Sequence, residues 1–213
     1  PVVILASGNL CHSEGLVRLN PIQKREPVPV GDDLREFNCL PGMARKNYDT
    51  VMGVRLPALE QMAEKSPLNM WIRGKGRSGI ITSGVNTAFV KEVQALTGGE
   101  MDILSLAFTN PLPRKRIRDF FSSVEGPVHV IEDGAGFLAD GLRAMGLPIV
   151  ARPEHSPVTE YSPALVAETI GCALPRPLPP ALPPVSRPPM ICAGCPYRLF
   201  AGVVSKLKSR GKL

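Results

Sequence analysis

Short, mostly apolar segments alternate with amphipathic ones through the middle of the chain. The apolar segments predict buried strands near residues 79–82, 102–108, 128–132 and 148–151. Between them, apolar side chains recur three or four positions apart, which is the spacing of a helix with one buried face. Buried strands that alternate with helices predict an α/β fold, in which a parallel sheet carries helices on both faces and right-handed crossovers join the strands.

Glycine and proline set the expected ends of these helices. The predicted helices run from about Ser83 to Gly98, Asn110 to Phe121, Gly134 to Met145, Pro163 to Ala173 and Leu199 to Leu207. Residues 43–65 also alternate apolar and charged positions at helical spacing, and Pro57 is expected to start or kink a helix that ends at Lys65.

The segments on either side of this region lack its regular alternation of strands and helices. Residues 1–6 are apolar and predict a strand already under way at Pro1, so the chain is expected to be a piece of a longer protein. Residues 7–45 have little periodicity and are typical of a connector. Eight of the fifteen residues in 175–189 are proline, which predicts a semi-rigid polyproline II spacer at a domain boundary. A ligand for a proline-recognising domain is the alternative interpretation.

Composition and charge narrow the functional class. The chain has 213 residues and a net charge of +6, but no acidic residue follows Glu168, so the excess is confined to a basic tail. Aromatic residues make up 5% of the chain, which does not favour a nucleic-acid interface. Neither a signal peptide nor an apolar run long enough for a transmembrane helix is found. Five cysteines without a disulfide framework indicate a reducing cytoplasm.

The cysteines divide into two groups. Cys11, Cys39 and Cys172 are isolated and are expected to be small buried residues. Cys192 and Cys195 form a C-x-x-C pair, whose spacing alone leaves metal binding, redox chemistry and a structural role equally open.

Other candidate features are weaker. Residues 74–79 match G-x-G-x-x-G but precede a strand, so they are interpreted as a flexible lead-in and not a dinucleotide loop. Ligands of open parallel sheets bind at the carboxyl ends of strands, here near Ser83, Thr109 and Glu132. Asp133 is expected to cap the next helix, and His129 to be packed in its strand.

Several stretches together resemble the alpha subunit of indolepyruvate ferredoxin oxidoreductase. The matching stretches, in chain order, are Cys11-His-Ser13, Leu40-Pro41, Ser66-Pro-Leu-Asn69, Ile81-Thr-Ser-Gly-Val-Asn-Thr-Ala-Phe-Val-Lys-Glu92, Asn110-Pro-Leu-Pro113 and Arg187-Pro-Pro-Met-Ile-Cys-Ala-Gly-Cys-Pro-Tyr-Arg198. The resemblance covers nearly the whole chain in the family's order.

The resemblance implies an enzyme that uses thiamine diphosphate and Mg²⁺. Such an enzyme oxidatively decarboxylates aryl pyruvates with coenzyme A and passes electrons through 4Fe-4S clusters to ferredoxin, with a smaller beta subunit as partner. It also implies a domain order: residues 1–20 would end a pyrimidine-binding domain and 21–65 would be a connector. Residues 66–174 would form a transketolase C-terminal-like middle domain, 175–189 a linker and 190–213 the start of the diphosphate-binding domain.

The resemblance also implies site residues. His12 is the catalytic candidate. Cys192, Gly194, Cys195, Tyr197 and Arg198 would lie at the cofactor, and Cys192 and Cys195 are the candidate metal ligands. Two positions depart from the family pattern, because Asn9 replaces an arginine and Tyr197 a histidine. A non-catalytic assembly module or an inactive homologue is therefore the alternative prediction, and the fragment alone is expected to lack activity.

Overall fold

The computed structural model describes residues 16, 18–24, 26–27, 37–153, 160–175 and 195–212. Packing divides the chain into two compact units, Pro1–Leu59 and Glu60–Leu213. The predicted strand at 1–6 and almost all of the proline-rich segment lie outside the described residues. Within the part that is described, no helix combines the length and apolar character needed to cross a membrane.

A five-stranded sheet is the centre of the second unit. Its strands are β1 (Met70–Ile72), β2 (Gly79–Ser83), β3 (Asp102–Leu106), β4 (Val128–Ile131) and β5 (Ile149–Val150), in the spatial order β1-β3-β2-β4-β5. β2 pairs in parallel with β3 and β4, and β4 pairs in parallel with β5. The four strands predicted from the sequence are therefore confirmed as parallel neighbours. β1, which the sequence did not predict, pairs antiparallel with β3 at the edge.

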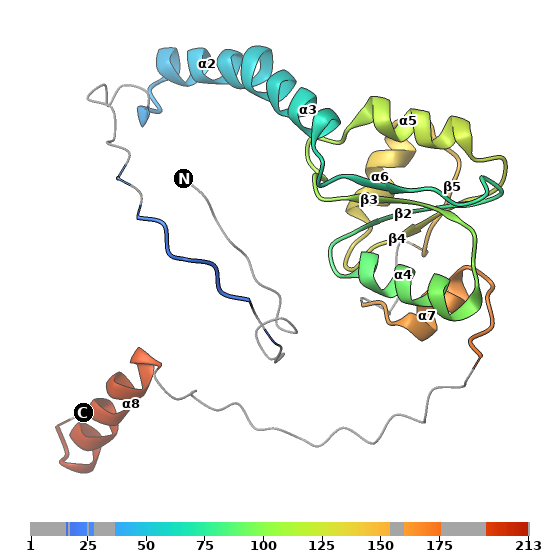
Figure 1. The fold of residues 1–213 in the computed structure, drawn as a ribbon. Helices are drawn as coiled ribbons and strands as arrows, with labels where there is room; N and C mark the ends of the chain where they lie inside the picture. The colour runs from blue at the N-terminus through green and yellow to red at the C-terminus, as the bar shows by residue number, and fades with distance from the viewer. Residues whose placement is uncertain are drawn as a thin grey trace. The chain divides into compact units, whose positions relative to one another are not determined.

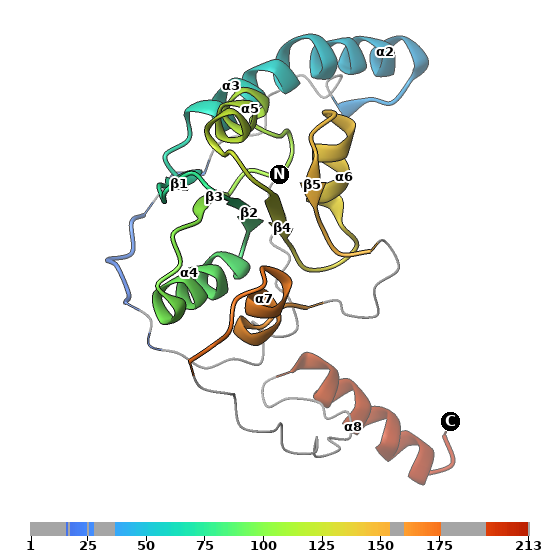
Figure 2. The same ribbon diagram turned by 90° about the vertical axis from the view of Figure 1, so that its right-hand side faces the viewer.

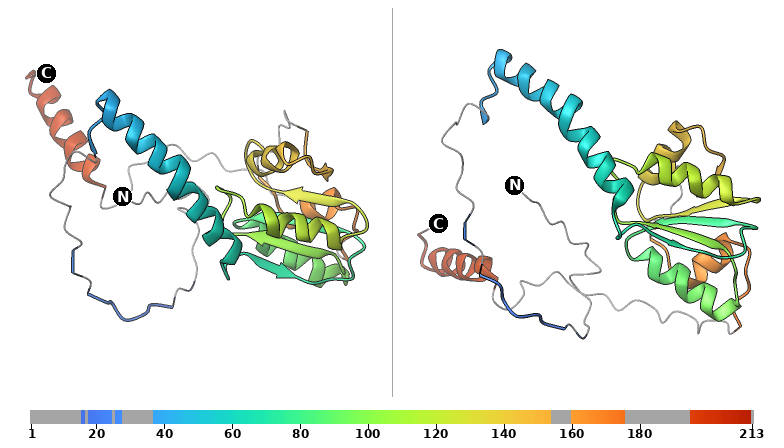
Figure 3. Two further views of the ribbon diagram at one scale, coloured as in Figure 1. Left: turned by 90° about the horizontal axis from the view of Figure 1, so that it is seen from above. Right: turned by 45° about the horizontal axis from the view of Figure 1, so that its top comes forward.

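Two helices cover each face of this sheet. The helices are α4 (Asn86–Thr97), α5 (Arg114–Ser123), α6 (Phe137–Ala144) and α7 (Pro163–Thr169). Figure 1 shows α5 and α6 above the strands and α4 and α7 below them, and Figure 2 shows α4 beside α7. Figure 3 shows α5 lying along the strands. The predicted fold class, a parallel α/β sheet with helices on both faces, is confirmed.

The side chains of successive strand residues point to opposite faces of the sheet, so they pack in two separate cores. On the α5–α6 face, Ile81 and Leu104 pack with Phe120 and Leu142. On the α4–α7 face, Ile80 and Ile103 belong to the other core cluster, together with the fully buried Val90 and Val166. Both faces of the central strands β2, β3 and β4 are thus largely buried, which explains why most of their positions are apolar.

Some predicted boundaries were wrong, and local hydrogen bonds explain why. β3 ends at Leu106, because the amides of Ala107 and Phe108 donate to Oδ1 of Asn69, at 2.8 and 3.1 Å, and not to a neighbouring strand. α6 begins at Phe137 and not at Gly134, since Gly134 and Gly136 both have positive φ.

The helical segment at 41–65 is longer than predicted. It consists of α2 (Pro41–Thr50), a π-helical turn η2 (Val51–Arg55) and α3 (Leu56–Lys65). Pro57 lacks an N–H group and cannot continue the regular ladder. The π turn directly before it, in which the amide of Leu56 donates to the carbonyl of Val51, accommodates the proline within the helix, so Pro57 does not start it.

The segment that precedes β2 is tied to the sheet by one buried carboxylate. Oδ1 of Asp102, which is 2% exposed, accepts from the amides of Gly74 at 2.6 Å and Gly76 at 3.2 Å. Its Oδ2 accepts from Nε1 of Trp71 at 3.2 Å. The G-x-G-x-x-G segment does precede its strand, as predicted, and it is a hydrogen-bonded turn and not a flexible lead-in.

Candidate functional site

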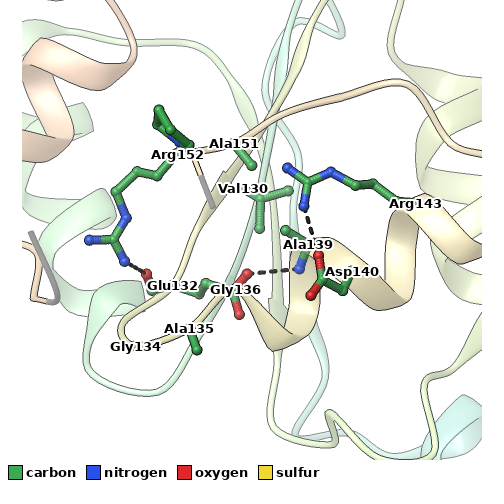
Figure 4. Close-up of a pocket in the computed structure, with 11 residues that line it drawn as sticks. Val130, Glu132, Gly134, Ala135, Gly136, Ala139, Asp140, Arg143, Ala151 and Arg152 are labelled. Atoms are coloured by element: carbon green, nitrogen blue, oxygen red, sulfur yellow. Dashed lines mark hydrogen bonds and ion pairs between the residues drawn. The ribbon is translucent and has the colours of Figure 1, made fainter. Parts of the chain in front are cut away.

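The carboxyl ends of β4 and β5 border a hollow that lies beside the start of α6 (Figure 4). Its lining combines the carboxylates of Glu132 and Asp140 with the guanidinium groups of Arg143 and Arg152, over small residues such as Ala139. Two positive and two negative side chains leave the hollow without a strong net charge. The position fits the sequence-based expectation that ligands would approach near Glu132.

Glu132 itself is committed to the backbone of α6. The side chain is 8% exposed, and its two oxygens accept from the amides of Leu138 and Ala139, each at 2.7 Å. These are first-turn amides, which have no partner inside the helix. Glu132 therefore caps α6, and a carboxylate with both oxygens engaged is a poor candidate for a catalytic base.

Asp133 has a different partner from the one predicted. Its Oδ1 accepts from the amide of Tyr161 at 2.8 Å and so ties the start of the α7 segment to the end of β4. The predicted N-cap role of Asp133 was wrong, because the preceding residue reaches the α6 amides. The sequence offered a signal for this, since two adjacent carboxylates precede the glycine-rich turn and either could have been the cap.

Arg152 and Arg143 are held by short-range contacts. Nη2 of Arg152 donates to the carbonyl oxygen of Glu132 at 2.7 Å, and the guanidinium lies 4.6 Å from the ring centroid of Tyr161. Nη1 of Arg143 donates to Oδ1 of Asp140 at 2.8 Å, and Figure 4 shows both contacts. Burial raises the pKa of the Tyr161 phenol, so this ring stays neutral beside the arginine.

His129 is packed in β4, as predicted. Burial lowers the pKa of its imidazole, and its buried Nδ1 has no hydrogen-bond partner among the described residues. The imidazole is therefore uncharged at neutral pH and packs within the strand.

Three of the sequence-predicted cofactor residues, Cys195, Tyr197 and Arg198, lie at the start of α8 (Pro196–Ser209). Cys195 precedes the helix and is half-buried, whereas Tyr197 and Arg198 are exposed in its first turn. His12, Cys192 and Gly194 lie outside the described residues, so the structure brings together only Cys195, Tyr197 and Arg198.

The start of α8 carries no negative charge of its own. Its first turn has no acidic residue and no side-chain cap, and Pro196 occupies the first position, where a proline is compatible with the helix. The positive end of a helix dipole attracts phosphate oxygens, and the cationic Arg198 adds to that field. Among the described residues, no three His, Cys, Asp or Glu side chains come together as a metal site.

The exposure of Cys39 differs from the sequence-based expectation. Cys39 was predicted to be buried but is exposed, whereas Cys172 is half-buried and Cys11 lies outside the described residues. Cys39 directly precedes Leu40 at the start of α2, a helix without buried residues, so no core surrounds it.

Comparison with known proteins shows similarity along most of the chain. The indolepyruvate oxidoreductase subunit IorA of Archaeoglobus fulgidus is 29% identical over 216 residues, which cover 92% of this chain and 34% of that protein. The subunit IorA of Methanothermobacter marburgensis is 27% identical over 224 residues, covering 93% of this chain and 34% of that protein. The resemblance predicted from the motifs is confirmed, and the chain spans about a third of the length of these relatives. No family model matches the chain.

A solved structure is also similar. The 2-oxoglutarate:ferredoxin oxidoreductase from Magnetococcus marinus aligns with 63% of this chain and 24% of its own, at 18% identity and a TM-score of 0.48.

Proposed function

We propose that this chain is the central part of the larger subunit of a cytoplasmic indolepyruvate ferredoxin oxidoreductase. The whole enzyme would oxidatively decarboxylate aryl pyruvates with coenzyme A, to give the acyl-CoA, CO₂ and reduced ferredoxin. One observation carries the proposal: similarity to indolepyruvate oxidoreductase subunits extends over 92% of the chain. A share this large includes the whole sheet and extends well beyond it.

The residues of this chain would bind and orient the cofactor. Thiamine diphosphate, when bound, supplies the carbanion chemistry of the decarboxylation. The positive end of the α8 dipole would face the diphosphate, with the guanidinium of Arg198 as a counter-charge. The exposed phenol of Tyr197 can donate one hydrogen bond to the same group, although it cannot carry the positive charge available to the histidine of the family pattern.

The C-x-x-C pair would serve the same site. We infer that Cys192 and Cys195 position the cofactor loop first and ligate metal second, and that Gly194 allows a close backbone approach to the diphosphate. The ligands of Mg²⁺ and further ligands of any 4Fe-4S cluster would come from other parts of the intact subunit. The sheet of β1 to β5 would act as a rigid middle domain, and a smaller beta subunit would complete the enzyme.

The test uses the intact subunit with its partner and measures indolepyruvate-dependent, coenzyme A-dependent reduction of ferredoxin. Arg198→Gln is expected to weaken thiamine diphosphate binding about 10-fold, the loss of one charge-assisted contact. Lys208→Gln, at the opposite end of α8, is the matched control and should leave binding unchanged. Equal binding by both variants would contradict the assignment of the α8 start to the cofactor.

The cysteine assignment has a separate test. Cys192→Ala combined with Cys195→Ala should weaken thiamine diphosphate binding in the intact enzyme while iron content is retained. Iron that falls by one cluster, with cofactor affinity unchanged, would reverse the order of the two roles.

A non-catalytic assembly module is the second candidate. It is favoured by Tyr197 in place of the family's histidine and by the commitment of Glu132 and Asp133 to backbone amides. An intact complex that assembles with the beta subunit but neither binds thiamine diphosphate nor reduces ferredoxin would support it.

A further inference from the structure

The turn that precedes β2 presents three cationic side chains. Arg73, Lys75 and Arg77 alternate with two glycines, and all three basic residues are exposed. This basic turn, residues 73–77, lies at the amino end of β2. Ligands of open parallel sheets bind at the opposite, carboxyl ends of the strands, so the basic turn is not part of such a site.

The backbone of the basic turn is held in one shape. The buried carboxylate of Asp102 accepts from the amides of Gly74 and Gly76. The amide between them, that of Lys75, donates to the carbonyl oxygen of Glu100 at 2.8 Å. Every amide from residue 74 to 76 therefore has an acceptor within the protein, and the three cations project from a fixed support.

The first of these cations is also ordered by an aromatic ring. The guanidinium of Arg73 lies 3.5 Å from the ring centroid of Trp71. Trp71 is anchored in turn, because its Nε1 donates to Oδ2 of Asp102 at 3.2 Å and its ring meets that of Phe120 edge-on, with 5.3 Å between centroids. A guanidinium stacked in this way keeps its planar fork of N–H groups, which pairs with a carboxylate through two parallel hydrogen bonds.

The positive charge of the basic turn is not neutralised locally. In the part of the chain that the structure describes, no carboxylate forms an ion pair with Arg73 or Arg77. Lys75 pairs with Glu100, but both side chains are more than half exposed, and such pairs contribute little free energy. All three cations are therefore available to a partner.

The charge around the turn extends over one half of the sheet. Residues 65–118 have nine lysines and arginines against three acidic residues, whereas residues 119–153 have two against five. The sheet order places β1, β3 and β2, from the first stretch, beside one another, and β4 and β5, from the second, at the other end (Figure 2). The half that carries the basic turn is thus the positive half.

These contacts favour an acidic protein as the partner. Phosphate sites in loops use backbone amides, and those of the basic turn are engaged. Single-stranded nucleic acid stacks its bases on aromatic faces, but Arg73 covers the ring of Trp71 at this turn. A second copy of the chain is also disfavoured, because Glu132 and Asp133 of the negative half are bound to backbone amides.

We propose that the basic turn is a docking surface for an acidic surface of another protein. Carboxylates of the partner would pair with Arg73 and Arg77, and Lys75 would add a third positive charge. Exposed charges of this kind speed the encounter of two proteins and make their affinity depend on salt, as in complexes that form and separate readily. The proposal does not depend on the proposed function or on the residues of α8.

The test titrates the 213-residue chain with a short polyglutamate peptide and follows the NMR shifts of the Gly74, Lys75 and Gly76 amides. Saturable shifts at these amides are expected. The affinity derived from them should fall at least about 5-fold between about 0.01 M and about 0.15 M salt, because the screening length shortens to about 8 Å. An oligouridylate of equal charge and inorganic phosphate are the competing probes, and both should bind the turn more weakly.

Two triple variants with the same loss of charge make the test specific. Arg73→Gln, Lys75→Gln and Arg77→Gln together should weaken peptide binding about 10-fold. The matched control combines Lys206→Gln, Lys208→Gln and Arg210→Gln on α8, and it should leave the affinity at the turn unchanged. The melting temperature checks that both variants fold.

A third variant separates geometry from charge. Arg73→Lys keeps the charge but removes the planar fork, so it should weaken peptide binding several-fold. Absence of saturable shifts at the turn, equal weakening by the α8 control, or equally tight binding of the oligouridylate or of phosphate would overturn the proposal.

Discussion

The role of Glu132 as the cap of α6 was not predicted from the sequence, and a single substitution tests it. Its carboxylate accepts from two first-turn amides of α6, each at 2.7 Å, in a nearly buried position. Glu132→Ala should lower the free energy of unfolding by about 2 kcal/mol, the cost of losing charged hydrogen bonds and a helix cap. Urea unfolding measures the change.

Asp140→Ala, on the exposed side of the same helix, is the control for Glu132. It removes the surface ion pair with Arg143 and one exposed negative charge in the first turn of α6, which together should cost less than about 1 kcal/mol. Equal destabilisation by the two variants would show that Glu132 is not the cap.

His129 predicts a pH dependence of stability. Burial lowers the pKa of its imidazole in the folded state below its ordinary value of 6.5. Between the two pKa values the unfolded chain binds a proton that the folded chain does not, so acid favours unfolding. The stabilisation is complete above pH 6.5 and decreases as the pH falls below it.

The measurement compares urea midpoints at pH 7.5 and pH 5.5 for the wild type and for His129→Gln. The difference between the two midpoints should be smaller in the variant, while His12 and His155 remain as internal controls. An unchanged difference would show that another group is responsible.

Among the elements, the end of β3 depends on a single buried side chain. Asn69 is 1% exposed, donates to the carbonyl of Ala63 at 2.7 Å and accepts from Ala107 and Phe108. Asn69→Leu would leave these backbone groups without partners, which should destabilise the chain by about 3 kcal/mol. The exposed Asn38→Ala is the control, with an expected change within about 0.5 kcal/mol. Thermal unfolding of the two variants distinguishes them.

The elements also show what a sequence can and cannot predict. Strands such as β2 and β4 were predicted because both of their faces are buried, so most of their positions are apolar. β1 was not, because a three-residue edge strand carries too few positions to establish a period. The end of β3 depends on Asn69, whose hydrogen-bond partners lie on another segment. The start of α6 depends on Glu132, and the sequence does not show whether Glu132 or the adjacent Asp133 caps that helix. The α8 residues were predicted from a motif, and geometry alone would not have singled them out.

At the scale of the whole molecule, the sheet and the proposed cofactor residues belong to different parts of the chain. Residues 60–175 include the sheet, both cores and their caps, and these contacts are mutually dependent. The proposed cofactor residues lie beyond them on α8, and the described carboxylates near the β4 end are engaged by backbone amides. A stable scaffold can thus exist without the reaction.

This separation predicts that the 213-residue chain folds cooperatively but does not turn over substrate. It spans about a third of the length of the related subunits. Indolepyruvate, coenzyme A and ferredoxin or a viologen are therefore expected to give no reduction above a protein-free blank. The intact subunit with its partner, assayed under the same anaerobic conditions, is the positive control. Turnover by the isolated chain would mean that a complete active site lies within these residues, and the division between scaffold and chemistry would be wrong.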